Sequence, residues 1–430
     1  MTKNTPFAVG TNQHQKKLKS GTGPQPHAEA EFTLQPADTA PGPVFEDADY
    51  LQGLLRDEDL RGATVIDSNF HHARIHDGVA TESHWANTSL ENATFSEVDA
   101  ERSSFSGNNM KGCAFNGGHW NDTTFQDNDL TDAVFQGTRM SNADFSSEQL
   151  VGASFDGCQL KEVSFTKADL TNAEVGGSEL SGAEFDQAIV HGAKFDPGAS
   201  ENINMERVKG SQSTATFEGR WKNATFEGAE LHDSSFADTI IEGSNMTKAT
   251  LTESAFTNAQ LHDVTLDDSD LKKADLTSST FEGGRMAGTK LTGASFEGAT
   301  ITGTSFLNAK GTGTNLSEAT IKDASFARAK LPRASFEQSE ITGGDFENTK
   351  AGQANFKTAK IAGTSFKGAD LSSSSFAGAK VSKGVSFEGA DLSNADFTDA
   401  EVEDGTSFKG ATLVSVRGLD PKFYAEAASR

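Results

Sequence analysis

The chain has 430 residues, a formal net charge of -25 and a pI near 4.7, which argues against passive adhesion to nucleic acid or anionic lipid and favours solubility or a basic partner surface. Phe contributes 31 residues against 3 Trp and 2 Tyr, and Gly contributes 42 against 9 Pro, which an ordinary mixed core does not produce. No apolar run of about 18 residues predicts a membrane span, and the N-terminus lacks the apolar core of a secretory signal. We therefore expect a cytoplasmic protein, with a secreted effector or a virion component as alternatives.

Residues 1–44 are rich in Thr, Gln, Gly and Pro and show no periodicity, which predicts a disordered arm. Residues 45–59 follow with Tyr50, Leu51, Leu54 and Leu55 at helix-like spacing. We expect them to form a short helical cap over what comes next, because the first turn of a repeat array otherwise exposes its core.

Residues 60–195 form a first array in which an apolar residue recurs at every fifth position. Phe95, Phe105, Phe115, Phe125, Phe135, Phe145, Phe155 and Phe165 alternate there with Met110, Trp120, Leu130, Met140, Leu150, Leu160 and Leu170. A helix requires apolar spacing of three and four and a strand requires two, so a sustained five fits neither element. The chain must therefore turn once in every five residues.

Two other positions in each unit support this interpretation. Small residues such as Ala93, Cys113 and Ala153 stand two places before the large apolar residue, which indicates that small and large residues together line the interior. Asn or Gly, as at Asn92 and Gly112, commonly precedes the small residue and tolerates the backbone angles of a corner. Cys113 and Cys158 are too far apart for a disulfide framework or a zinc site and are interpreted as packing residues.

The segments "NATFS", "GASFD", "KADLT" and "SNADF" resemble the pentapeptide-repeat family. The resemblance covers about residues 60–413 and implies an all-β fold: a right-handed quadrilateral β-helix with four units per coil and short helical caps. Coils stacked about 4.8 Å apart would give roughly 17–18 coils and a rod of roughly 85 Å. Phe and aliphatic residues alternate from unit to unit, so two opposite faces are expected to stack Phe.

Residues 196–225 break the pattern and shift the register by one residue, which predicts a loop or bulge. Arg207, Lys209, Arg220 and Lys222 would make a projecting loop locally basic, and some family members use such loops on their targets. A tolerated insertion without function is the alternative interpretation.

Residues 226–413 form a second array in the shifted register. Lys290, Lys310, Lys330 and Lys350 recur every twenty residues and are expected to stack on one face. Charges about 5 Å apart in water repel by only about 0.8 kcal/mol, so this row could be a solvated column or a contact face for an anionic partner. Single-residue insertions precede Phe387 and Phe408, which predicts paired bulges.

Residues 414–430 contain Phe423 and Tyr424 after Asp420 and Pro421. They are expected to form a C-terminal cap or a dimer contact, because the C-terminal segment mediates dimers in several family members.

No complete catalytic, phosphate-binding or calcium motif is present, so we expect no enzyme, no cofactor and no metal site; three histidines, His71, His72 and His76, are a weak metal alternative. Two functions remain open. The first is a rigid scaffold or spacer that binds protein partners of unknown identity, with no direct contact to nucleic acid or membrane. The second follows from the resemblance: Phe-rich family members imitate DNA and bind a type II topoisomerase such as gyrase, for which Asp127, Asp129 and Asp132 are candidate contacts.

Overall fold

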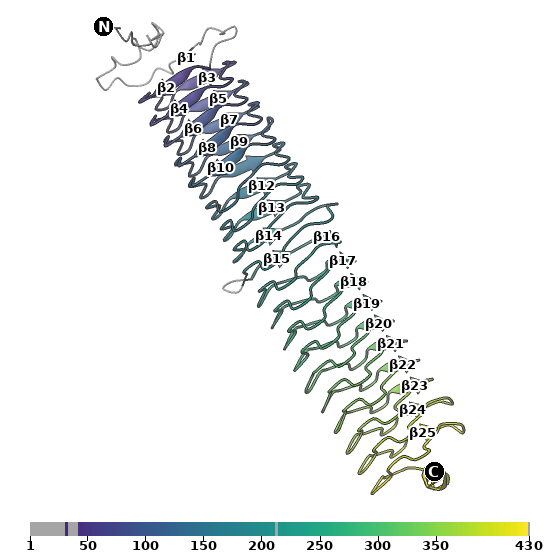
Figure 1. Cartoon of the computed structure of the whole chain (residues 1–430). Helices are drawn as coiled ribbons and strands as arrows, with labels where there is room; N and C mark the ends of the chain where they lie inside the picture. Colours follow the sequence, from purple (N-terminus) through teal and green to yellow (C-terminus); the bar gives the residue numbers. More distant parts are fainter. Residues whose placement is uncertain (1–30, 33–41, 211–213, 429–430) are drawn as a thin grey trace, which may run out of the picture.

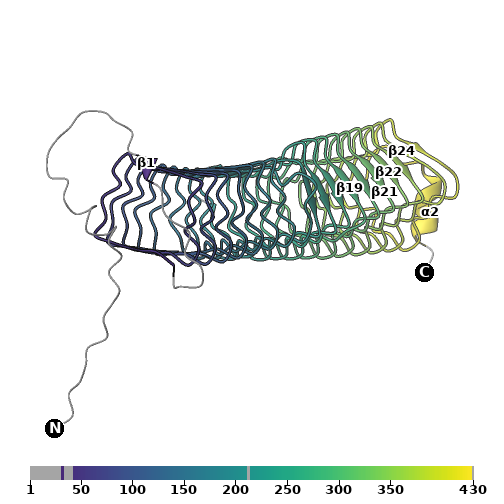
Figure 2. The same cartoon turned by 90° about the horizontal axis from the view of Figure 1, so that it is seen from above.

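The computed structural model describes residues 31–32, 42–210 and 214–428. These residues form one long rod in which the chain winds around a single axis and the described ends lie at opposite ends of the rod (Figures 1 and 2). About 18 coils stack along the axis, and every strand pairing is parallel. The all-β solenoid expected from the sequence is confirmed.

Each coil has four faces, which we number by the apolar residue that points inward. The first coil supplies Phe45, Tyr50, Leu55 and Leu60 to the first, second, third and fourth face. Every later coil adds one residue to each column, usually twenty residues further on, as the pairing of Phe115 with Phe135 shows.

Three sheets carry the longest ladders, and their strands are two or three residues long. The third face carries β1 (Glu31–Phe32), β3 (Leu54–Arg56), β5 (Arg74–His76), β7 (Thr94–Ser96), β9 (Ala114–Asn116), β11 (Val134–Gln136), β12 (Ser154–Asp156), β13 (Glu174–Gly176), β14 (Lys194–Phe195) and β15 (Thr216–Phe217). The first face carries β2 (Val44–Glu46), β4 (Thr64–Ile66), β6 (His84–Ala86), β8 (Ser104–Ser106) and β10 (Thr124–Gln126). The fourth face carries β16 (Arg220–Lys222), β17 (Ile240–Glu242), β18 (Gln260–His262), β19 (Thr280–Glu282), β20 (Thr300–Thr302), β21 (Thr320–Lys322), β22 (Glu340–Thr342), β23 (Lys360–Ala362), β24 (Lys380–Val381) and β25 (Glu401–Val402).

The interior is a continuous column of stacked rings. Phe135 and Phe155 stack on the third face with centroids 4.6 Å apart and planes 2° apart. Rings from the opposite first face meet them edge to face, as Phe145 meets Phe155 at 5.8 Å and 82°. Both geometries are favourable for aromatic pairs, so the two Phe-stacking faces predicted from the sequence are confirmed.

The corners follow the expected residues. Asn92, Gly112 and Asn142 all have positive φ angles, of 56°, 64° and 58°. Gly and Asn adopt such angles at the lowest cost, which explains why they recur just before the small interior residue.

The expected N-terminal helix is wrong. Residues 45–59 form the first coil, with strands β2 and β3 and with Tyr50 and Leu55 buried at the five-residue spacing. The helix-like spacing came from Leu51, which is 53% exposed, and Leu54, which does not belong to the five-residue series. Most of the arm, including residues 1–30 and 33–41, lies outside the described residues, but Glu31–Phe32 forms β1 and pairs with β3, contrary to the expectation of disorder.

The interruption at residues 196–225 lengthens one coil without opening the core. Phe195 pairs with Phe217, twenty-two residues on, and the two rings stack at 5.5 Å. Met205, Val208 and Trp221 are buried in their columns. The described part of this segment therefore stays within the coil, and residues 211–213 lie outside the description.

Both single-residue insertions near the end are taken up by glycine. Gly384 and Gly405 have φ angles of 90° and 92°, and the Gly384 N–H donates to the Gly405 carbonyl at 3.4 Å. They lie on adjacent coils at the same corner, which confirms the prediction of paired bulges.

The last coil is closed by α2 (Lys422–Ala427). Phe423 is 4% exposed, and its ring centre lies 4.9 Å from that of Phe408, the last ring of the first face. The side chain of Glu426 accepts a hydrogen bond from Ser407 at 3.0 Å. The expected C-terminal cap is therefore present.

Candidate functional site

The lysine row, Lys290, Lys310, Lys330 and Lys350, lies on the second face. These residues pair in register from coil to coil, and all four side chains are exposed. Stacked coils place such neighbours about 4.8 Å apart. The row predicted from the sequence is thus one straight line of cations.

Only the first lysine of the row has a salt-bridge partner among the described residues. Lys290 Nζ lies 3.2 Å from Asp270, which also binds Lys272 at 3.1 Å. Burial alone would raise the pKa of Asp270, but the hydrogen bonds from Lys272 and Lys290 outweigh it and hold the pKa below its usual range. Lys310, Lys330 and Lys350 have no carboxylate within salt-bridge distance in the described part of the chain.

A shallow groove of about 590 Å³ runs beside the last two lysines of the row. It is lined by Thr312, Lys330, Pro332, Arg333, Lys350, Gly352, Gln353, Asp370 and Ser372. Arg333 donates from Nε to Gln353 at 3.1 Å and adds a further cation to this face. Arg333 is not part of the lysine row predicted from the sequence. Its position three residues after Lys330, within the same pentapeptide unit, is the sequence feature that predicts its place on this face.

The four basic residues of the interruption do not form one patch. Arg220 and Lys222 flank Trp221 in β16 on the fourth face, whereas Lys209 lies on the second face and Arg207 at the corner between the first and the second. Three of the four are paired: Arg207 with Asp186 at 2.7 Å, Arg220 with Glu242 at 2.6 Å and Lys222 with Glu201 at 2.6 Å.

The predicted acidic contacts do not form a column along the rod. Asp127, Asp129 and Asp132 follow one another around a single coil, and Asp129 stacks between Asn109 and Gln149. Asp129 also accepts the N–H of Thr131 at 3.0 Å, which ties its carboxylate to the local turn.

That turn bond recurs along the rod. Asp or Asn just before the inward apolar residue accepts the backbone N–H two residues later at Asp49, Asn69, Asp99, Asn109, Asp129, Asp144, Asp169, Asn204, Asn245, Asp270, Asp275, Asn315, Asp345, Asn355, Asp370, Asp391 and Asp396. Such Asx turns stabilise the backbone locally. Part of the acidic surface therefore has a structural role whatever the rod binds.

The C-terminal pair divides between two roles. Phe423 is buried inside its own chain and is not exposed for a partner. Tyr424 is 39% exposed, and its hydroxyl donates to the Val416 carbonyl at 3.2 Å. Of this pair, Tyr424 is the residue that a dimer contact could use.

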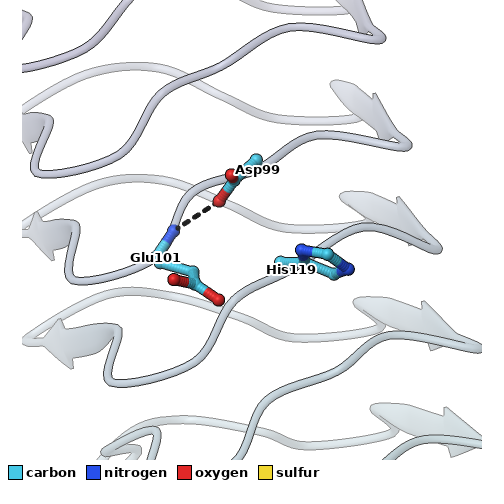
Figure 3. Close-up of side chains that lie close together, drawn as sticks. All are labelled: Asp99, Glu101 and His119. Atoms are coloured by element: carbon cyan, nitrogen blue, oxygen red, sulfur yellow. Dashed lines mark hydrogen bonds between the residues drawn. The ribbon is translucent and has the colours of Figure 1, made fainter.

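Asp99, Glu101 and His119 are the one group of three metal-ligating side chains that lie close together among the described residues, with ligand atoms within 4.8 Å of one another (Figure 3). His71, His72 and His76, the sequence-based alternative, do not form such a group. Arg139 contacts Nε2 of His119, and Asn121 donates to Glu101 at 3.0 Å. A guanidinium that donates to His119 occupies the lone pair that a metal would need, so this group is better described as a charged network.

No helix among the described residues has the length and apolar character to cross a membrane.

Family models for pentapeptide repeats match most of the array. The model described as "pentapeptide repeat region" matches residues 108–185. The model of eight repeat copies matches residues 244–283, 254–293, 289–326 and 321–357, and the model of nine copies matches residues 366–412. No curated protein sequence matches the chain.

Several solved structures of pentapeptide-repeat proteins are similar to this chain. HetL from the cyanobacterium Nostoc, described as involved in heterocyst differentiation regulation, is 19% identical over 63% of this chain and 92% of its own, with a TM-score of 0.22. A trypsin-treated form of QnrB1, a plasmid-mediated fluoroquinolone resistance protein, is 20% identical over 56% of this chain and 93% of its own, with a TM-score of 0.19. A pentapeptide-repeat protein from the Arabidopsis thaliana thylakoid lumen is 26% identical over 24% of this chain and 65% of its own, with a TM-score of 0.17. The repeat matches and the four-sided coil agree: the chain belongs to the pentapeptide-repeat family.

Proposed function

We propose that the protein is a non-catalytic rigid rod that binds an acidic protein partner on its second face. The observation that carries this proposal is the row of Lys310, Lys330 and Lys350, three aligned cations without acidic partners in the described chain. Residues 301–380 contain ten Lys and Arg against seven Asp and Glu, within a chain whose net charge is -25. A local excess of cations in an acidic protein selects an acidic surface and speeds its association.

The filled interior supports a binding role in place of catalysis. Apolar side chains occupy the axis of the rod from Phe45 to Phe423, so substrates would have to bind on the outer faces. The groove beside Lys330 is shallow and open, whereas catalysis requires a site that excludes water.

The test is charge reversal at the row. Lys310, Lys330 and Lys350 are changed together to Glu, and partners are captured from a cell extract by crosslinking at low and at moderate salt. A control protein changes Lys322, Lys357 and Lys383 to Glu, which gives the same net charge on other faces of the same rod.

We expect the wild-type protein and the control to capture an acidic partner that the row variant does not capture. Moderate salt should weaken this capture. Equal capture by the wild-type protein and by both variants would contradict a role for the second face.

A DNA-mimic function is the second candidate, and the charge distribution favours it for one part of the rod. Residues 42–270 contain 40 Asp and Glu against 14 Lys and Arg. Two features argue against it for the whole rod. The lysine row interrupts the acidity further along. B-DNA as long as a rod of roughly 85 Å would carry roughly 50 charges at one per about 1.7 Å, whereas the net charge of this chain is -25.

Supercoiling by purified gyrase, with this protein titrated in, separates the two functions. A DNA mimic inhibits or protects the enzyme, and reversal of Asp127, Asp129 and Asp132 to Lys reduces the effect. An unchanged supercoiling reaction at a large excess of the protein would contradict the DNA-mimic function and favour the scaffold function.

A further inference from the structure

The small interior position of each unit often carries a polar side chain, and two hydrogen-bonding patterns recur there. At Thr239, Ser269, Ser279 and Ser339 the hydroxyl donates to the carbonyl three residues earlier in the same coil. In the other pattern the donor reaches back to the carbonyl of the inward residue 23 positions earlier, on the preceding coil. Ser103 donates to Ala80 at 2.6 Å, and Thr123 donates to Ala100 at 3.0 Å. The same bond links Ser254 to Leu231, Thr289 to Leu266, Thr314 to Leu291 and Thr349 to Phe326.

Two asparagines in one corner use both ends of their amide. Asn108 accepts the N–H of Thr88 at 2.9 Å and donates to the Trp85 carbonyl at 3.0 Å. Asn128, one coil further, accepts the N–H of Asn108 at 3.0 Å and donates to the Phe105 carbonyl at 3.0 Å. Each buried amide thus supplies one acceptor and one donor to the coil before it.

Glu148 occupies the next position in this corner, and it is 2% exposed. Its Oε2 accepts the N–H of Asn128 at 2.9 Å, as the asparagine oxygens do. Its Oε1 is buried without a hydrogen-bond partner. The position 23 residues earlier is Phe125, so the pattern calls for a donor where an ionised carboxylate has none.

We infer that Glu148 is a neutral carboxylic acid in the folded rod, with Oε1–H donating to the Phe125 carbonyl, and that loss of this proton loosens the surrounding coils. A carboxylic acid presents one acceptor and one donor, like the amides of Asn108 and Asn128. Ionisation replaces the donor by a second acceptor and leaves a buried negative charge, which is costly in an apolar interior. Glu148 is therefore a pH-sensitive element within the core.

The surroundings agree with this assignment. Burial raises the pKa of Glu148 to about 7; hydrogen bonds from Asn128 and from the backbone of Asp127 oppose the shift, and the negative charge of Asp127 adds to it. Asp127 is the nearby titratable group, while Asp144 and Asp169 face outward and accept N–H groups from Ser146 and Thr171. Above Glu148 in its corner stands Ala168, which has neither charge nor hydrogen-bonding side chain.

The sign of the effect follows from the raised pKa. The folded state binds this proton more tightly than the unfolded chain, so the stabilising contribution is complete below about pH 4.5 and is lost as the pH rises to about 7. Above that value the contribution no longer changes.

The test compares the wild-type protein with Glu148→Gln, whose amide supplies the same acceptor and donor at every pH. Hydrogen exchange of the Asn128 amide and its neighbours is followed from pH 5 to pH 9 in both proteins. The ratio of the two rates removes the intrinsic pH dependence of exchange. We expect the wild-type rate, divided by the rate of the variant, to rise between pH 5 and pH 7 by at least tenfold and up to roughly a hundredfold, and to stay level above pH 7.

A constant ratio across this range would overturn the proposal. Glu148→Ala serves as the second variant, because Ala is common at this position and folds without the bond. It should show the same pH-independent exchange as Glu148→Gln. If Asp127→Asn removed the pH dependence of exchange and Glu148→Gln did not, the group responsible would be Asp127.

Discussion

A single interior ring illustrates how the core resists change at the scale of the residue. Phe155 is fully buried, stacks on Phe135 and meets Phe145 and Phe165 edge to face. Backbone strands surround this narrow column on four sides and are fixed by their ladders, so they cannot move inward to fill a void.

We therefore predict that Phe155→Ala lowers the free energy of unfolding by about 3–5 kcal/mol. Phe155→Leu, which keeps most of the volume and resembles its column neighbour Val175, should cost less than about 1.5 kcal/mol. Denaturant unfolding followed by circular dichroism measures both, and equal costs for the two changes would contradict a rigid core.

Acidic surface residues have a second residue-scale role, which Asp169 shows. Its carboxylate accepts the backbone N–H of Thr171 at 3.0 Å and the hydroxyl of the same residue at 2.6 Å. Asp169→Asn keeps the acceptor and should change the free energy of unfolding little. Asp169→Ala removes it and should cost about 0.5–1.5 kcal/mol. A similar loss in both variants would mean that charge, and not the turn, is what matters.

Glu148 shows where residue-scale prediction fails. The five-residue spacing places position 148 inside the rod, two places before Leu150, yet Glu148 reads as one more surface acid when charges are simply counted. The available signal is the disagreement between residue type and position. Spacing determines which way a side chain points, but a partner on the preceding coil determines whether a polar group can remain there.

At the scale of the element, the cap α2 protects the final coil. It covers Phe408 with Phe423, and Lys422 forms an ion pair with Asp404 at 2.6 Å. Without it, the last ring and the last strand edge would face water, and exposed strand edges promote association between chains.

Phe423→Ala should therefore increase hydrogen exchange in residues 387–413 while leaving the first coils unchanged, because each coil contacts only its neighbours. Tyr424→Phe is the matched control, since it removes the hydroxyl of a partly exposed residue and leaves the buried ring of Phe423 in place. Uniformly faster exchange along the whole rod would contradict local capping.

Element boundaries were the hardest feature to predict from sequence. The five-residue period identified both arrays, their corners and the paired glycine bulges, because inward side chains, turns and coil length all share that period. The sequence predicts a helix in place of the first coil because Leu51 and Leu54 add apolar residues beside Tyr50 and Leu55. At residues 196–225 the sequence showed that one residue was added, but which strands would absorb it depended on contacts between coils.

The whole molecule combines opposing pH effects. Hydrogen bonding with Arg61 lowers the pKa of Asp59 in the first coil, and hydrogen bonding with Thr398 lowers that of Asp396 near the last. Lowered carboxyl pKa values stabilise the fold above about pH 4 and lose that effect as the pH falls further. Glu148 acts in the opposite direction between about pH 4.5 and pH 7.

We predict that thermal stability is greatest on the acidic side of neutrality, near pH 5, and falls toward both pH 3 and pH 8. The net charge of -25 adds to the decline at higher pH, because mutual repulsion grows as the chain as a whole loses protons and becomes more negative. In Glu148→Gln the decline above pH 5 should be smaller. Melting temperatures measured across this range in constant salt provide the check, and stability that keeps rising to pH 8 would contradict the prediction.

The constant rise of the coil gives this molecule discrete lengths. Duplication of one twenty-residue coil would lengthen the rod by about 4.8 Å and turn each face only by the small rotation that relates neighbouring coils, because the new coil repeats the angles of its neighbours. The extra residues at Gly384 and Gly405 bulge at a corner, and the ring stack from Phe366 through Phe387 to Phe408 continues past them. A partner bound to one face and an attachment at the cap could thus be set apart in whole steps, so that the number of repeats works as a molecular ruler.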